Sequence, residues 1–332
     1  MTPSAPQRFG IESAAEADKE IFRRDHRGDR SVETVAAGAS GRRFFRIRDE
    51  AGSRILMHYP AKPEENLFFS GIGRALFKAD VPVPAILLDR PRERLVWLED
   101  LGDRDLYSLK NSPDREHAYR MAIEALAHFQ GLPVDLFERD AAPTLPPFDE
   151  ELYRFEHNYF RKEWMARVAP EKRSDERIDA ELEGLLAQIL GEREKDVWIH
   201  RDFQSKNLLI DPQGKFRIVD FQGFRRGHPF YDLASLLVDP YAELSWESRD
   251  SLFRHYCEIT GKNPEEEAPA FARLGCQRLM QALGAYGKFG LGAGVTFFES
   301  RIEPALRLLE HAASEAGLTH LSRLAREAID RS

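Results

Sequence analysis

The residues best suited to chemistry are two aspartates and an asparagine between residues 198 and 221. Asp202 is followed five residues later by Asn207, and Asp220 comes after a later apolar run. Phosphoryl transfer needs one carboxylate that orients the attacking hydroxyl and accepts its proton, together with oxygen ligands for Mg²⁺. The residue types therefore predict Asp202 as the catalytic base, and Asn207 and Asp220 as metal ligands.

A predicted β-hairpin would bring these three side chains together. Residues 208–210 and 216–219 are rich in β-forming side chains, and residues 211–214 between them have the composition of a turn. The hairpin places the loop before its first strand beside the residue after its second strand. The alternative is that the three are ordinary turn residues, since Asp and Asn favour turns. Their fixed spacing and the flanking strands favour a shared site.

The same stretch carries a resemblance to a known family. His200-Arg201-Asp202 with Asn207, followed by Asp220-Phe221-Gln222, resembles the catalytic and metal loops of kinases, and residues 229–234 extend the match. On these motifs the chain resembles the aminoglycoside phosphotransferase and choline kinase family. Within it, the chain looks most similar to the bacterial kinases that phosphorylate the anomeric hydroxyl of N-acetylmuramate and N-acetylglucosamine. That narrower resemblance rests on residues 38–45, 65–66, 81–84 and 98–102.

The resemblance implies an α+β, two-lobed protein-kinase-like fold, with a small antiparallel β N-lobe and a large helical C-lobe. Residues 1–98 would form the nucleotide-binding N-lobe with an N-terminal helical segment, residues 99–102 the linker, and residues 103–332 the helical C-lobe with the catalytic loop, metal loop and acceptor site. The composition agrees, because strand-like runs end near residue 98 and helical periodicity begins near residue 112. By resemblance, His200 and Asp232 support the catalytic loop structurally.

A glycine-bearing turn between two predicted strands is the candidate phosphate loop. Its backbone N–H groups can approach phosphates closely, and arginines follow it directly. By resemblance, ATP is the phosphoryl donor, Mg²⁺ is the metal, and the main chain of the linker binds the adenine. The predicted nucleotide-binding residues are Gly38, Ser40, Gly41, Arg42, Arg43, Glu99 and Leu101.

The lysine with which kinases hold the phosphates is missing from the third predicted strand, which carries Met57-His58 instead. The sugar kinases that the chain resembles also lack an obvious lysine there. Lys62, Arg43 and Arg46 are alternative cations, and spacing does not decide among them. Further candidates for contact with substrate or phosphate are Lys206 and Arg225.

The composition narrows the class of protein. The chain has 332 residues, of which 42% are hydrophobic and 31% charged, as in a globular protein with one large domain or two lobes. A net charge of −8 without a long basic block disfavours a nucleic-acid partner. No apolar run is long enough to span a membrane, and the N-terminus lacks the apolar core of a signal peptide. Two cysteines are too few for a disulfide framework or a zinc site.

These features predict a cytoplasmic, ATP- and Mg²⁺-dependent kinase that acts on a hydroxyl of a small molecule. The expected partners are a nucleotide and the acceptor, and a monomer is the expected state. By resemblance the preferred acceptor is an N-acetylhexosamine, as in cell-wall sugar recycling. An aminoglycoside, choline or another small alcohol is an alternative that the acidic composition keeps open. The second alternative is an inactive, pseudokinase-like nucleotide-binding module, which the missing lysine allows and the intact acidic residues oppose.

Overall fold

The computed structural model describes residues 31–37, 41–50, 52–139, 142, 144–172, 175–192 and 195–331. The predicted N-terminal helical segment lies outside these residues, as do Gly38 and Ser40. Within the described part of the chain no helix has the length and apolar character needed to cross a bilayer.

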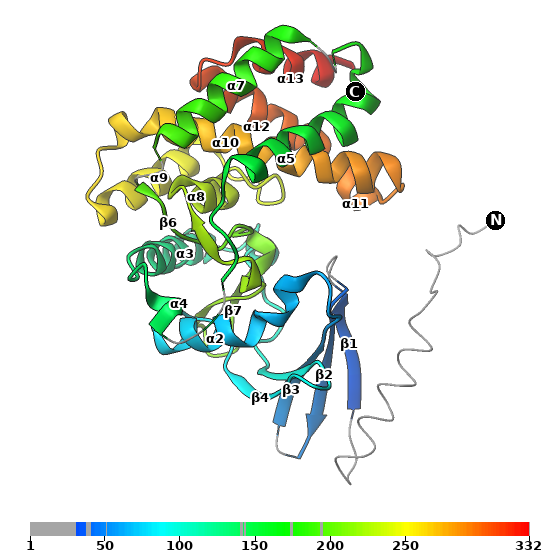
Figure 1. Ribbon diagram of the computed structural model, residues 1–332, viewed down its shortest axis with the longest axis vertical. Helices are drawn as coiled ribbons and strands as arrows, with labels where there is room; N and C mark the ends of the chain where they lie inside the picture. Colours follow the sequence, from blue (N-terminus) through cyan, green and yellow to red (C-terminus); the bar gives the residue numbers. More distant parts are fainter. Residues whose placement is uncertain are drawn as a thin grey trace, which may run out of the picture.

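The small lobe is a five-stranded antiparallel sheet with the strand order β1-β2-β3-β5-β4 (Figure 1). Its side chains alternate between two faces, as the pleat requires. On β2, Phe45 and Ile47 are buried in a small cluster on one face, whereas Phe44 and Arg46 line a cleft on the other. The strands are β1 (Ser31–Ala37), β2 (Arg43–Asp49), β3 (Gly52–His58), β4 (Ile86–Arg90) and β5 (Leu95–Glu99).

One helix, α2 (Phe69–Lys78), packs against the small lobe and also touches the metal loop. Its apolar side is buried in the main core, and Phe69 stacks on Phe221 with ring centroids 4.6 Å apart. Gly73 lies at the same contact, where an added Cβ would come within 2.9 Å of the Phe221 ring. Because Gly73 has no side chain, α2 can pack closely against Phe221, the residue that follows Asp220.

The large lobe is built around α10 (Pro264–Tyr286), which packs against α5, α8 and α12. Asn263 caps its N-terminus by accepting a hydrogen bond from the Glu265 N–H, and Pro264 occupies the first turn. Near its C-terminus, a Cβ at Gly287 would lie 2.2 Å from the Glu163 carbonyl oxygen, so only glycine permits this contact. Figure 1 shows these helices gathered at the end of the molecule away from the sheet.

The other helices of the large lobe complete this layer of packed helices. Those of eight residues or more are α3 (Arg115–Gln130), α5 (Glu150–Phe160), α7 (Glu176–Gly191), α8 (Phe230–Leu237), α9 (Trp246–Thr260), α12 (Ile302–Glu315) and α13 (Thr319–Arg331). Shorter ones are α4 (Leu136–Arg139), α6 (Ala166–Val168) and α11 (Thr296–Glu299), with π-helical turns at Arg161–Met165 and Gly287–Gly292.

Two small strand pairs hold the predicted catalytic stretch between the lobes. The predicted hairpin is confirmed: β7 (Leu208–Ile210) pairs with β8 (Phe216–Ile218), and Gly214 in the turn has a φ of 78°. A second pair joins β6 (Val197–Ile199) to β9 (Arg225–Gly227). The loop from β6 to β7 and the loop from β8 to β9 consequently run side by side, and each begins where the other ends.

Candidate active site

The catalytic loop is held in place by the carboxylate of Asp232 on α8. Its two oxygens accept the backbone N–H groups of His200 and Arg201, the latter at 2.8 Å. These bonds hold Arg201 at a φ of 78°, a conformation that non-glycine residues rarely adopt. At the other end of the loop, Asp239 accepts the Ser205 N–H at 2.9 Å and its hydroxyl at 2.6 Å. Two buried carboxylates thus fix the loop that carries Asp202.

Burial raises the pKa of Asp232 to about 7, although the bonds from His200 and Arg201 oppose the shift. We expect Asp232→Ala to leave two buried N–H groups without acceptors, at about 1–3 kcal/mol each. Urea unfolding should therefore show a loss of roughly 3 kcal/mol or more.

The exposed Asp250, which pairs with Arg254 across one turn of α9, provides the control. Asp250→Ala should change the free energy of unfolding by less than about 0.5 kcal/mol. The folded-state pKa of Asp232 lies above its ordinary value of 3.8. Its contribution to the free energy of unfolding is therefore largest below pH 3.8 and falls as the pH rises through about 7. The difference between wild type and Asp232→Ala should shrink over that range, and a pH-independent difference would contradict the assignment.

His200 lies behind the catalytic loop, away from any substrate. Its ring is buried, and Nε2 contacts the Val219 carbonyl oxygen at 2.9 Å, one residue before Asp220. Burial lowers the pKa of His200, against the opposing charges of Asp220 and Asp202. The buried imidazole thus joins the catalytic loop to the residue that follows β8, which agrees with the supporting role predicted for it.

Asp202 is partly exposed and faces positive charge. The Arg278 Nη1 atom on α10 lies 3.6 Å from Asp202 Oδ1. Burial acts to raise the pKa of Asp202, but the charges of Arg278, Arg201 and other cations outweigh it, and the pKa falls below its ordinary value. Asp202 is therefore ionised at neutral pH and can accept a hydrogen bond from an approaching hydroxyl.

The structure brings Asn207 and Asp220 to one end of a cleft between the lobes. Asn207 donates from Nδ2 to the Asp202 carbonyl oxygen at 2.8 Å, which ties it to the catalytic loop. Asp220 has a φ of 66°, and its Oδ1 accepts a hydrogen bond from Arg42 Nη2 at 2.6 Å. Arg42 also donates to the side chain of Gln222. Asp202, Asn207 and Asp220, the predicted base and metal ligands, therefore lie on adjoining loops.

The cleft has a volume of about 400 Å³ and is lined by both apolar and charged side chains. A cavity of this size with apolar walls and few polar groups is typical of a small-ligand site. Asn207 and Asp220 lie at one end and the linker at the other. The apolar lining residues are Val35, Phe44, Ile55, Phe69, Pro84, Leu98, Leu101, Leu209, Val219 and Phe221.

Glu99 and Leu101 line the cleft at the linker, as their predicted role requires. The Glu99 side chain does not face a ligand, because it accepts the Ala85 N–H at 3.1 Å and the Arg217 guanidinium at 2.9 Å. The Glu99 N–H donates to the Ala85 carbonyl oxygen at 2.9 Å.

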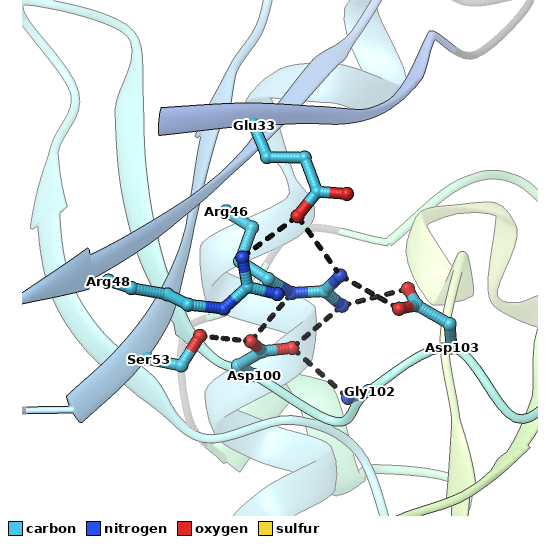
Figure 2. Close-up of polar contacts among 7 residues, drawn as sticks. All are labelled: Glu33, Arg46, Arg48, Ser53, Asp100, Gly102 and Asp103. Carbon is cyan, nitrogen blue, oxygen red and sulfur yellow. Dashed lines mark hydrogen bonds and ion pairs between the residues drawn. The ribbon is translucent and has the colours of Figure 1, made fainter. Parts of the chain in front are cut away.

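The linker is fixed by a polar cluster that the sequence did not indicate (Figure 2). Arg46 on β2 donates to both carboxylate oxygens of Asp100, at 2.7 and 3.0 Å, and to both of Asp103, at 2.8 Å. Asp100 also accepts the Gly102 N–H at 3.0 Å and a bond from the Ser53 hydroxyl. Bidentate pairs of this kind combine strength with fixed geometry. Arg46 thus joins the sheet to the linker and is not placed to hold phosphates.

The other candidate cations lie in different places. Arg43 points to the opposite face of β2, where its guanidinium contacts His58 Nδ1 at 2.9 Å, and it does not line the cleft. Lys62 is exposed and also lies outside the cleft lining. Lys206 lines the cleft, 3.5 Å from Asp105 and 4.0 Å from the centre of the Tyr107 ring. Arg42 is the arginine that reaches the metal loop.

Gly41 and Arg225 complete the set of predicted residues. Gly41 has a φ of 75° and packs against Pro60, just before β2. Arg225 is buried on β9 and donates from Nε to the Gly223 carbonyl oxygen at 3.0 Å. It lies outside the cleft lining, next to the catalytic loop through the pairing of β9 with β6.

The antiparallel lobe, the helical lobe and the interlobe cleft define a two-lobed, protein-kinase-like α+β fold, as predicted. Solved structures share it. A choline/ethanolamine kinase family protein from Mesorhizobium loti superposes with a TM-score of 0.64 at 17% identity, covering 96% of this chain and 98% of that one. An aminoglycoside 2′-phosphotransferase in complex with GDP gives a TM-score of 0.61 at 16% identity, covering 90% and 97%.

Sequence comparison then gives the family. The phosphotransferase enzyme family matches residues 31–272, so the chain belongs to this family and is a small-molecule kinase. The resemblance predicted from the motifs is confirmed. An N-acetylmuramate/N-acetylglucosamine kinase from Pseudomonas putida is 27% identical over 272 residues, covering 78% of this chain and 76% of that protein. The protein of that name from Pseudomonas aeruginosa is 25% identical over 300 residues, covering 84% and 83%.

Proposed function

We propose that the protein is a cytoplasmic, ATP- and Mg²⁺-dependent kinase that phosphorylates the anomeric hydroxyl of an N-acetylhexosamine. The observation that carries the reaction type is that Asn207 and Asp220 line the interlobe cleft, while Asp202 lies on the adjoining loop, where its main-chain carbonyl accepts a hydrogen bond from Asn207. The acceptor is supported by the names of the two Pseudomonas relatives, which align over most of the chain. A monomer is the working assumption for the assembly.

Asp202 would orient the acceptor hydroxyl and accept its proton as the phosphoryl group is transferred. The cations around it keep it ionised, so it is ready to accept this hydrogen bond at neutral pH. Asp232 and Asp239 hold the loop fixed, and such positioning dominates catalysis of phosphoryl transfer. The low pKa means that Asp202 acts mainly by orientation and takes up the proton late.

Asn207 and Asp220 fit the requirements of Mg²⁺. The amide nitrogen of Asn207 is engaged with the Asp202 main chain, which leaves its oxygen for a metal, and Asp220 contributes a carboxylate. In the described part of the chain no three His, Cys, Asp or Glu side chains gather as a metal site. Mg²⁺ needs none, because it binds through one or two protein ligands, waters and substrate phosphates. When bound, it would neutralise charge on the phosphates.

Arg42 would take the place of the missing lysine and contact the phosphates. It is buried, it lines the cleft just before β2, and its guanidinium already reaches Asp220. Main-chain groups of Glu99 and Leu101 would bind the adenine at the other end, and the main chain of Gly41 would contact the phosphates. Lys206 is placed at the cleft for contact with a phosphate or the acceptor.

Arg42→Met should raise the KM for ATP about 10- to 100-fold, because a hydrogen bond to a charged group contributes about 1.5–3 kcal/mol. Arg42→Lys should recover part of this loss. Arg43→Met is the matched control, since the neighbouring side chain faces His58, and it should leave the KM for ATP within about threefold of wild type. Equal KM values for Arg42→Met and wild type would contradict the phosphate contact.

The proposed reaction is tested by ADP release with ATP and Mg²⁺ and four acceptors: N-acetylmuramate, N-acetylglucosamine, kanamycin and choline. Turnover should occur with the two hexosamines, and the product should release phosphate under mild acid as a sugar 1-phosphate does. Turnover confined to kanamycin or choline would overturn the acceptor. ATP binding without turnover of any acceptor would favour an inactive nucleotide-binding module.

A further inference from the structure

Two arginines beside Asp202 have no carboxylate partner. Of the buried arginines in the described part of the chain, Arg42, Arg46 and Arg278 each have a carboxylate oxygen within 4.0 Å. Arg225 is only 5% exposed, yet it has none among the described residues. Arg201, half-buried on the catalytic loop, has no ion pair with a described residue either. Burying an arginine without such a partner is costly.

The strand register explains why these two arginines are neighbours. Arg225 on β9 pairs with Ile199 on β6, and Arg201 follows Ile199 by two residues. The side chain of Arg201 runs over Gly223, whose carbonyl oxygen accepts the Arg225 Nε–H at 3.0 Å. The terminal nitrogens of both guanidinium groups make no hydrogen bonds to described residues. They are not closed off from solvent either, so an anion in solution can reach them.

No carboxylate of the described residues contacts either guanidinium group. Burial and the charge of Arg201 lower the pKa of Arg225 to about 10, although Glu65, Tyr231 and Asp202 act in the opposite direction. Burial also disfavours the charged form of Arg201, but the charges of Asp202 and other groups, Glu65 among them, raise its pKa; Glu65 lies beyond ion-pair distance of both arginines. The buried Glu156 is engaged with Tyr231 and Gln277, at 2.8 Å in each case. The acidic groups around the pair therefore act on it from a distance and leave its terminal nitrogens available to an anion.

We propose that Arg201 and Arg225 form a binding site for an anionic group, a carboxylate or a phosphate, beside Asp202. Two guanidinium groups offer parallel N–H donors that match the oxygens of either group. This inference rests on the proposed function for its first source, the lactyl carboxylate of N-acetylmuramate, which N-acetylglucosamine lacks. The second source is a free phosphate ion. The same charges oppose a cationic acceptor such as an aminoglycoside or choline.

The test compares KM values for N-acetylmuramate and N-acetylglucosamine in wild type, Arg201→Met and Arg225→Met. Both sugars have the same reacting hydroxyl, so effects on Asp202 or on folding cancel in the ratio of the two KM values. If the acceptor carboxylate binds here, the KM for N-acetylmuramate divided by the KM for N-acetylglucosamine should rise about 10-fold or more in each variant. Arg225→Lys, which keeps the charge, should recover part of the preference.

Arg226→Met is the matched control on the next residue of β9. Its guanidinium contacts the Asp196 carbonyl and lies 5.6 Å from the centre of the Trp198 ring, away from Arg201. The KM ratio should stay at the wild-type value in this variant.

A second measurement distinguishes the two sources. Inorganic phosphate should raise the melting temperature of wild type but not of Arg225→Met if a free anion binds. A phosphate-dependent shift with an unchanged KM ratio supports the site and identifies the free ion as its ligand. An unchanged ratio together with no phosphate-dependent shift overturns the proposal. If neither sugar is phosphorylated but the shift occurs, the anion site stands and the proposed acceptor fails.

Discussion

Replacing Asp220 by alanine should lower kcat by about 10³-fold or more, comparable to the loss of a major electrostatic contact in the transition state. Asp220 lines the cleft with Asn207, has a left-handed backbone conformation, and accepts a hydrogen bond from Arg42. Without it, Mg²⁺ would lose its charged protein ligand, and Arg42 would lose its ion pair with the loop that follows β8. The measurement is kcat at saturating ATP, together with the Mg²⁺ concentration that gives half-maximal rate.

Asp103→Asn is the control for a general loss of negative charge from the cleft. Asp103 lines the same cleft but lies at the linker end, where it pairs with Arg46. Its change should lower kcat less than about 10-fold, and the Mg²⁺ concentration for half-maximal rate should stay near the wild-type value. Wild-type activity in Asp220→Ala would remove the metal role from this residue.

The part of the site that the sequence predicted is the part built from neighbours along the chain. The turn between β7 and β8 has strong local signals, and once the hairpin is placed, the convergence of Asp202, Asn207 and Asp220 follows from geometry. The antiparallel small lobe was likewise indicated by strand-like runs separated by turns. The comparisons confirm the fold and the family, whereas the individual roles of these residues remain predictions.

Residue spacing does not choose among the arginines near β2, although strand alternation contains a usable signal. Arg42, Phe44 and Arg46 share a face and all line the cleft, whereas Arg43 faces the other side. Alternation alone excludes Arg43 from the face of β2 that lines the cleft. It would not have separated Arg42 from Arg46, because that depends on which end of the cleft the linker occupies. Gly38 and Ser40 lie outside the described residues.

Contacts between distant segments could not be predicted from one sequence. Arg278 lies on a long helix with little to distinguish it from the other charged residues there, yet its Nη1 atom lies 3.6 Å from Asp202 Oδ1. The bond from Arg46 to Asp100 depends on how the linker folds back beneath the sheet. Such pairs are set by the packing of whole elements, and neither composition nor periodicity records them.

Replacing Asp202 by asparagine should lower kcat about 10²- to 10⁴-fold, the usual contribution of a general base. Asn keeps the shape of the side chain but cannot accept the proton. Because Asp202 is not among the residues that line the nucleotide cleft, ATP should still bind with near wild-type affinity. Loss of turnover with retained ATP binding separates this role from misfolding. Wild-type turnover by the Asp202→Asn enzyme would exclude Asp202 as the general base.

The pH dependence offers a second, independent test of Asp202. Burial favours its neutral form, but Arg278 and Arg201 hold the pKa of its carboxyl below the ordinary value, so wild-type kcat/KM should fall only on strong acidification. Removing one of these charges in Arg278→Met leaves burial less opposed, and the pKa of Asp202 must rise. The acidic limb of the pH profile should therefore move towards neutral pH, while Arg278→Lys should keep it near its wild-type position. A limb that does not move in Arg278→Met would mean that another group titrates there, and that the protein activates its acceptor without Asp202.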